Sequence, residues 1–85
     1  MKEFKYVITD AQGIHARPAG LLVKEAAKFA STIKVAKGEK EADLKRLLAV
    51  MGLGIKQGEE ITIKIEGADE DNAAEAIETF FKENL

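Results

Sequence analysis

Ile61 begins a strict alternation of isoleucine with polar residues. Ile61, Ile63 and Ile65 fall on one face of an extended chain, and Thr62 and Lys64 fall on the other. Because neighbouring side chains of a strand point to opposite sides, the pattern predicts a strand with one buried face and one open face. Antiparallel sheets tolerate an open face, whereas parallel sheets are covered on both. The segment therefore favours a sheet that is covered on one side only.

Three further segments have the spacing of strands. Lys2–Thr9 alternates charged residues with Phe4, Tyr6 and Ile8. Thr32–Ala36 and Lys40–Asp43 flank the turn Lys37-Gly38-Glu39, a pattern that indicates a hairpin. The chain is therefore expected to supply four strands.

Apolar residues at intervals of three and four predict three helices. The first begins at Ala16, with apolar positions at Ala19, Leu22, Val23, Ala26 and Ala30. The second is short, is capped by Asp43 and ends at Gly52 and Gly54, with apolar positions at Leu44, Leu47, Leu48 and Met51. The third begins with Asp69, Glu70 and Asp71, and its buried stripe is Ala73, Ile77, Phe80 and Phe81.

The resulting order, β-α-β-β-α-β-α, predicts a two-layer α+β domain with the helices on one face of an antiparallel or mixed sheet. Its 85 residues are expected to form a single domain, 1–85. The absence of cysteine excludes disulfides and thiolate metal sites, and the net charge of −2 gives no overall attraction to nucleic acid. No segment resembles a signal peptide or a membrane span, so we expect a cytoplasmic protein, and we expect it to be a monomer.

The single histidine lies in Gly13-Ile14-His15-Ala16-Arg17-Pro18-Ala19, which is typical of a helix start. Free N–H groups and the positive end of the helix dipole attract anions there, and a proline in the first turn loses little. Arg17 adds donors suited to phosphate oxygens. The segment therefore predicts an anion site beside an imidazole. A plain surface or capping histidine is the alternative, and the residues favour neither a metal site nor a cofactor.

Leu47, Leu48 and Met51 have two interpretations, as core residues or as a partly exposed apolar patch that binds partners. Basic residues could form its rim: Arg17, Lys24, Lys45 and Arg46. The predicted helix places Lys45 and Arg46 in its first turn, which is unfavourable for its dipole and suggests a role outside folding. Gly20 lies inside the first predicted helix, where the close approach of a partner or of the second helix would account for a glycine.

The segment from Gly13 to Ala19 resembles the active-site signature of HPr, the phosphocarrier family of the bacterial phosphoenolpyruvate-dependent sugar phosphotransferase system. The resemblance extends through Leu44–Ile55, Gln57-Gly58 and Glu66–Glu70 to essentially the whole chain. It implies an open-faced sandwich with a four-stranded antiparallel sheet. It implies a carrier rather than an enzyme, in which His15 accepts a phosphoryl group on Nδ1 from phosphorylated enzyme I and passes it to enzyme IIA domains. It further implies that Arg17 and the backbone N–H groups of Ala16 and Arg17 contact that group.

Arg46 departs from the pattern that the resemblance sets. Many members from Gram-positive bacteria carry at this place a serine that an ATP-dependent kinase phosphorylates. Arginine cannot accept that phosphate, and its positive charge does not mimic the modified state. Two alternatives therefore stay open beside sugar uptake. One is a regulatory phosphocarrier of a nitrogen-related or dihydroxyacetone-kinase branch, and the other is a non-catalytic binding module.

Overall fold

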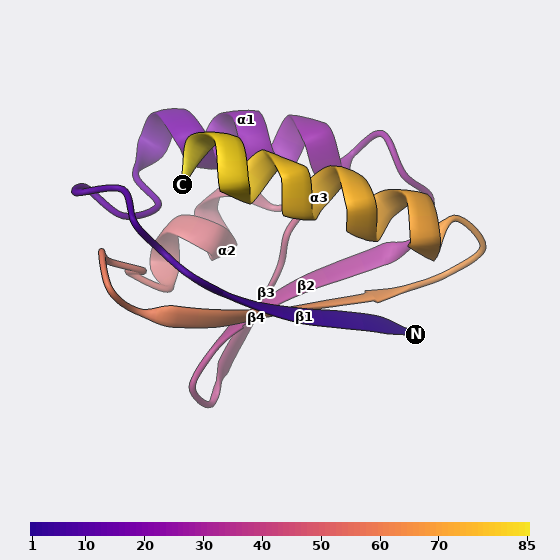
Figure 1. Cartoon of the computed structure of the whole chain (residues 1–85), viewed down its shortest axis with the longest axis horizontal. Helices are drawn as coiled ribbons and strands as arrows, with labels where there is room; N and C mark the ends of the chain where they lie inside the picture. Colours follow the sequence, from indigo (N-terminus) through magenta and orange to yellow (C-terminus); the bar gives the residue numbers. More distant parts are fainter.

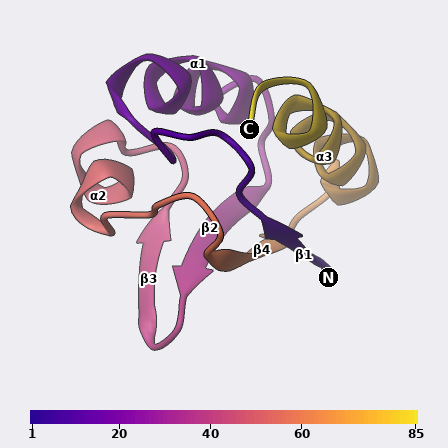
Figure 2. The same ribbon diagram turned by 60° about the vertical axis from the view of Figure 1, so that its left-hand side comes forward.

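One sheet of four strands forms one layer, and three helices cover one of its faces (Figures 1 and 2). The computed structural model describes residues 1–85. The strands are β1 (Lys2–Val7), β2 (Thr32–Lys37), β3 (Lys40–Asp43) and β4 (Glu60–Glu66). The helices are α1 (Ala16–Ala26), α2 (Leu47–Gly52) and α3 (Glu70–Asn84). The strand order is β1-β4-β2-β3 and every neighbouring pair is antiparallel, so the predicted α+β architecture is confirmed.

β4 lies inside the sheet, where it pairs with both β1 and β2. Ile61, Ile63 and Ile65 are fully buried beneath the helices, as the alternation predicted. Ile63 faces Phe4 on one side and Val35 on the other. Because apolar side chains from neighbouring strands meet on one face, the helices bury a continuous core against that face.

Two predicted boundaries were too long. β1 ends at Val7 rather than Thr9, because the N–H groups of Thr9 and Asp10 donate to the carbonyl of Leu85 at 2.6 and 3.0 Å instead of continuing the sheet. α1 ends at Ala26, and Ala30, predicted to belong to its apolar stripe, is exposed. The N–H of Ala30 donates to the carboxylate of Asp69 at 2.9 Å. Contacts distant in sequence therefore end both elements.

The predicted start of the second helix was wrong. Asp43 closes a turn instead of capping a helix: its carboxylate accepts from the N–H of Lys45 at 2.9 Å, and its carbonyl from that of Arg46 at 3.0 Å. α2 begins at Leu47 and Arg46 is its N-cap residue, so Lys45 and Arg46 lie outside its first turn. Within α2 the buried side chain is Val50. Neither basic residue therefore lies within the helix, although Arg46, at the N-cap, remains at the positive end of the α2 dipole.

α1 and α2 are tied together at both ends. The Nζ of Lys45 donates to the carbonyl of Phe29, just after α1, at 2.7 Å. The N–H of Ile14, just before α1, donates to the carbonyl of Ile55, just after α2, at 3.1 Å. The residues that follow α2 consequently support those that lead into α1. None of the three helices has the length and apolarity that crossing a bilayer requires.

Candidate functional site

The loop before α1 rests on the backbone of Ile55. Gly13 has a φ of +68°, and its N–H donates to the carbonyl of Asp10 at 2.9 Å. A Cβ at Gly13 would lie 2.3 Å from the carbonyl oxygen of Ile55, so only glycine fits this conformation and this approach. The side chain of Ile14, next in the chain, is buried. The loop therefore delivers the chain to the start of α1 from a fixed direction.

His15 is the N-cap residue of α1, with an extended backbone (φ −91°, ψ −179°). Its carbonyl accepts from the N–H of Ala19 at 2.9 Å, while its ring makes no capping hydrogen bond. The side chain is 36% exposed, and Nε2 lies 3.9 Å from Oδ1 of Asp10, beyond hydrogen-bonding distance. Oδ1 of Asp10 accepts instead from the N–H of Gln12 at 2.8 Å. The imidazole is thus held at the surface with its ring nitrogens free of hydrogen bonds.

The first turn of α1 presents two free donors next to this ring. The N–H groups of Ala16 and Arg17 have no partner in the chain, Pro18 has no N–H, and that of Ala19 is already bonded. No acidic residue lies in this turn, and Arg17 is exposed and makes no ion pair. Free N–H groups, the helix dipole and a guanidinium together favour an anion at this position.

A shallow surface depression of about 280 Å³ lies beside His15 and is lined by Asp10, His15, Arg17, Pro18, Leu21 and Asn84. Sequence reasoning did not assign three of these to the site: Asp10, Leu21 and Asn84. Leu21 is 47% exposed, and its position four residues after Arg17 on the same helix face was a usable signal. Asn84 comes from the far end of the chain, and no local pattern indicates it. The depression joins α1 to the C-terminal end of α3.

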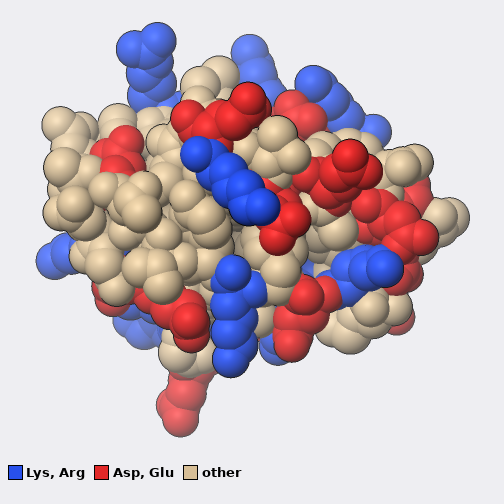
Figure 3. All heavy atoms as spheres, in the orientation of Figure 1, with Lys and Arg blue, Asp and Glu red and all other residues tan.

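The three apolar residues of α2 form an exposed surface. Leu47, Leu48 and Met51, here named the α2 patch, are 39%, 84% and 39% exposed, so the interpretation as core residues was wrong. Figure 3 shows a broad area without charged side chains at the end of the molecule where α2 and the loop before α1 lie. The patch thus lies at the same end of the molecule as His15.

The other predicted partner-binding residues differ in their surroundings. Lys24 and Arg46 are exposed, whereas Lys45 is half-buried and its amine is bonded to the carbonyl of Phe29. Lys45 thus reaches the opposite end of α1 from His15, about 16 Å away at 1.5 Å per residue. A Cβ on Gly20 would meet no atom within 4 Å, so the second helix does not account for this glycine.

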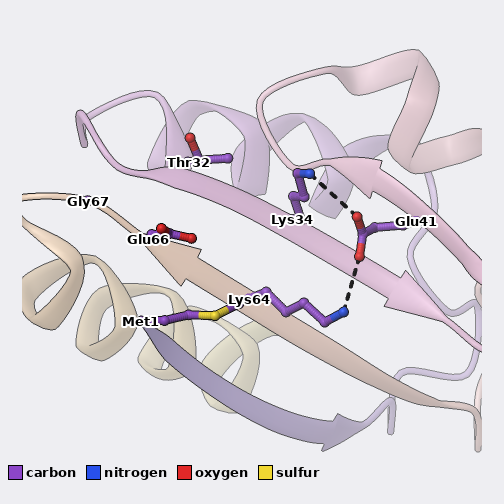
Figure 4. Close-up of a pocket in the computed structure, with 7 residues that line it drawn as sticks. All are labelled: Met1, Thr32, Lys34, Glu41, Lys64, Glu66 and Gly67. Carbon is purple, nitrogen blue, oxygen red and sulfur yellow. Dashed lines mark hydrogen bonds and ion pairs between the residues drawn. The ribbon is translucent and has the colours of Figure 1, made fainter.

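A larger depression of about 650 Å³ lies far from His15, on the open face of the sheet (Figure 4). Its polar centre is Glu41, which reaches the amines of Lys34 and Lys64 at 3.6 and 3.3 Å. Lys34 and Lys64 face each other across β2 and β4, and Glu41 relieves the repulsion between them. The one carboxylate offsets part of the positive charge of the two lysines, so the arrangement stabilises the sheet and offers no reactive group.

Known proteins resemble this chain along its whole length. A family model described as the PTS HPr component phosphorylation site matches residues 2–83. Phosphocarrier protein HPr of Lysinibacillus sphaericus is 51% identical over 83 residues, covering 98% of this chain and 94% of the relative.

Solved structures show the same likeness. The histidine-containing phosphocarrier protein of Mycoplasma superimposes with a TM-score of 0.94 at 45% identity, covering 96% of this chain and 93% of the other. The HPr dimer of Thermoanaerobacter tengcongensis gives 0.78 at 38% identity, covering 98% and 95%. The chain therefore belongs to the HPr family, the phosphocarrier proteins of the bacterial phosphotransferase system.

Proposed function

We propose that His15 accepts a phosphoryl group from phosphorylated enzyme I and passes it to enzyme IIA domains of a sugar uptake system. One observation carries the assignment: a partly exposed imidazole, free of hydrogen bonds, adjoins two unpartnered N–H groups and the guanidinium of Arg17. Phosphoryl transfer depends mainly on the positioning of donor and acceptor and on stabilising the charge of the phosphoryl group in the transition state. The proposed site supplies both with groups of this chain.

Nδ1 is the proposed acceptor atom. Nε2 faces the carboxylate of Asp10, which would repel a phosphoryl dianion attached there. In the step, the lone pair of Nδ1 forms the bond to phosphorus while the bond between phosphorus and the donor breaks, and its electron pair leaves with the donor. The N–H groups of Ala16 and Arg17 and the guanidinium of Arg17 would hold the three phosphoryl oxygens. The reverse process delivers the group to the next protein.

A carrier must hold its phosphoryl group without trapping it. Each charge-assisted hydrogen bond contributes about 1.5–3 kcal/mol, and water competes for the oxygens at an open site. Two N–H groups and one guanidinium therefore give moderate stabilisation. Pro18 removes a third donor that most helices would supply at this position. The absence of that donor favours release of the group to an acceptor.

The surface proposed to meet the partners is the α2 patch, with Gly20, Lys24 and Arg46 beside it. Exposed apolar groups with a polar rim are typical of docking surfaces, and Met adapts to partners of different shape. The basic residues suit acidic partners. Lys45 contributes by holding the loop after α1, through the carbonyl of Phe29, rather than by presenting its charge.

Arg46 favours a second candidate, a phosphocarrier of a nitrogen-related or dihydroxyacetone-kinase branch, because it replaces the hydroxyl through which sugar-linked regulation would act. The acceptor chemistry would be the same and the partner different. Capture of the enzyme IIA partner by the phosphorylated chain separates the two candidates, since each branch has its own acceptor domain.

The proposal is tested by incubating the chain with enzyme I and ³²P-labelled phosphoenolpyruvate. We expect acid-labile label on the wild type and none on His15→Ala. Arg17→Gln should be labelled about 30-fold more slowly, the equivalent of about 2 kcal/mol for one charge-assisted contact. Full labelling of His15→Ala would refute the assignment.

The monomer expected from the sequence is tested separately, because the relative from Thermoanaerobacter tengcongensis was solved as a dimer. Sedimentation equilibrium should give a mass near that of one chain, 9.3 kDa. A concentration-independent value of twice that mass would contradict the expectation.

A further inference from the structure

Lys37, at the end of β2, binds the backbone that follows α2. Its Nζ donates to the carbonyls of Leu53 and Gly54 at 3.3 and 3.1 Å. The same amine lies 3.0 Å from Oε2 of Glu59, and both side chains are about one-third exposed. One lysine therefore joins a strand of the sheet to two carbonyls and one carboxylate of the segment 53–59.

Glu59 closes the same segment from its other end. Its Oε1 accepts from the N–H of Lys56 at 2.7 Å, while Oε2 pairs with Lys37. The hydrogen bond from Lys37, followed by that from the N–H of Lys56, lowers the pKa of Glu59 below its ordinary value. Both carboxylate oxygens are thus engaged, and the carboxylate stays ionised at neutral pH.

The residue enclosed by these contacts is Ile55. Its carbonyl accepts from the N–H of Ile14 and lies against Gly13, so it supports the residues that lead into His15. No hydrogen bond links Lys37 or Glu59 to His15 directly. The hydrogen-bonded route from these two residues to the imidazole runs through the segment that carries Ile55.

We propose that Lys37 and Glu59 are positioning residues for His15. They hold the segment 53–59 so that the carbonyl of Ile55 fixes Gly13 and Ile14, which in turn fix the imidazole relative to the free N–H groups of Ala16 and Arg17. The inference rests on the proposed function, since it assigns a role in phosphoryl acceptance. A displacement of about 1 Å at a reacting group can cost up to about 100-fold in rate, so a remote contact of this kind has a measurable effect.

The test compares Lys37→Met with Lys37→Arg and with the control Lys40→Met. Lys40 lies in the same hairpin and forms no ion pair or side-chain hydrogen bond. We expect Lys37→Met to lower kcat for phosphorylation by enzyme I about 10-fold with KM nearly unchanged, because the α2 patch is untouched. Lys37→Arg should recover most of that rate, and Lys40→Met should match the wild type.

Glu59→Gln, which keeps an acceptor for the N–H of Lys56, should lower kcat about 3-fold.

Amide hydrogen exchange at Ile14 and the NMR shifts of the His15 ring report the position of the segment without any phosphoryl transfer. In Lys37→Met we expect Ile14 to exchange about 10-fold faster than in Lys40→Met and the ring signals to shift, while β4 amides keep their protection. Wild-type kcat and wild-type exchange in Lys37→Met would overturn the inference, as would a uniform loss of protection over the whole chain. Absence of label on the wild type would refute the proposed function, and the exchange and ring signals would still decide whether Lys37 positions His15.

Discussion

The two long helices begin in opposite ways. α1 has no acidic residue in its first turn, and its free N–H groups adjoin a partly exposed imidazole and an exposed arginine. α3 has Glu70 and Asp71 in its first turn, and Glu70 also pairs with the N-terminal amine at 2.7 Å and accepts from the N–H of Gly67 at 3.3 Å. The chain thus supplies its own negative charge to α3 and leaves α1 without any.

The difference shows that one helix start in this chain contributes to stability, while the other leaves its donors free for binding. Negative charge at a helix N-terminus is stabilising, so α3 gains from its own carboxylates. α1 forgoes that gain, and the unsatisfied donors are available to an external anion. An incoming phosphoryl group would supply to α1 what Glu70 and Asp71 supply to α3.

The largest expected effect is a loss of stability when either glycine that leads into a long helix is replaced by alanine. An added Cβ at Gly13 would overlap the backbone of Ile55. An added Cβ at Gly67, where φ is +154°, would overlap Ser31. Alanine at either position should lower the free energy of unfolding by about 3 kcal/mol, through positive φ and backbone overlap. Urea denaturation measures this, with Gly38→Ala, which has positive φ but open space around it, as a control expected near 1 kcal/mol.

Only Gly13→Ala should also slow labelling of the folded protein, because only that glycine leads to His15. Equal labelling rates for the folded alanine variants at Gly13 and Gly67 would show that the loop before α1 does not position the acceptor.

The next largest effect is expected from giving α1 the charge that α3 has. Ala16→Glu should slow labelling by about 100-fold, because one carboxylate about 6 Å from a dianion costs about 3 kcal/mol at an intermediate dielectric. Its melting temperature should be unchanged or slightly higher, since the acid suits the dipole. Initial labelling rates measure the effect against Ala16→Gln as the uncharged control. Similar rates for Glu and Gln would contradict an electrostatic role for this end of the helix.

A pH-dependent loss of stability is expected at the start of α3. The Asp69 carboxylate accepts from the hydroxyl and the N–H of Ser31 and from the N–H of Ala30, and these bonds, that of the hydroxyl first, lower its pKa. A carboxyl whose pKa is lowered by folding stabilises the fold above its unfolded pKa of about 3.9, and that stability is lost as the pH falls through the folded value.

Asp69→Asn should therefore be less stable than the wild type at pH 7. Between pH 5 and the acid limit the variant should lose less stability than the wild type, and the difference should equal the free energy that the ionised Asp69 contributes. Urea denaturation at several pH values gives the two profiles, and parallel profiles would contradict the role of Asp69. Labelling at neutral pH should be unaffected, because α3 begins at the other end of the molecule from the start of α1 (Figure 1), where His15 is the N-cap residue.

The smallest expected effect comes from the opposite change to Ala16→Glu, the removal of an acid from a helix start. Asp71→Asn removes one acid from the first turn of α3 and should cost about 0.5 kcal/mol, less at high salt. Its partner Lys2, 2.9 Å away, is half-exposed, so their ion pair adds little. Thermal unfolding at two salt concentrations measures the change. An increase in stability would contradict the dipole argument that distinguishes the two helices.

The strands and the start of α1 were predictable because their signals are local. The alternation at Ile61–Ile65 requires only that side chains of a strand point to opposite sides, and the segment around His15 requires only the chemistry of a helix end. The start of α2 was not predictable from spacing, because Asp43 has two competing uses, as a helix cap and as the acceptor of a turn.

The periodicity of Leu44, Leu47, Leu48 and Met51 left two interpretations open, because it identifies an apolar face without stating whether the rest of the protein covers that face. Only the tertiary structure showed that Val50 is the residue of α2 that is buried in the core, while Leu47, Leu48 and Met51 are exposed.

The sequence by itself predicted the α+β layers and strands with one open face, which the structure confirms. It also predicted an anion site beside one histidine, which stays a prediction. Each of these depends on periodicity or on donors within a few residues. Tertiary structure alone decided that the carbonyl of Ile55 lies against Gly13, that Lys37 and Glu59 bind the segment 53–59, and that Asn84 borders the depression beside His15. These contacts join residues from distant parts of the chain, and their distances are set by how the helices pack on the sheet, which no local pattern encodes.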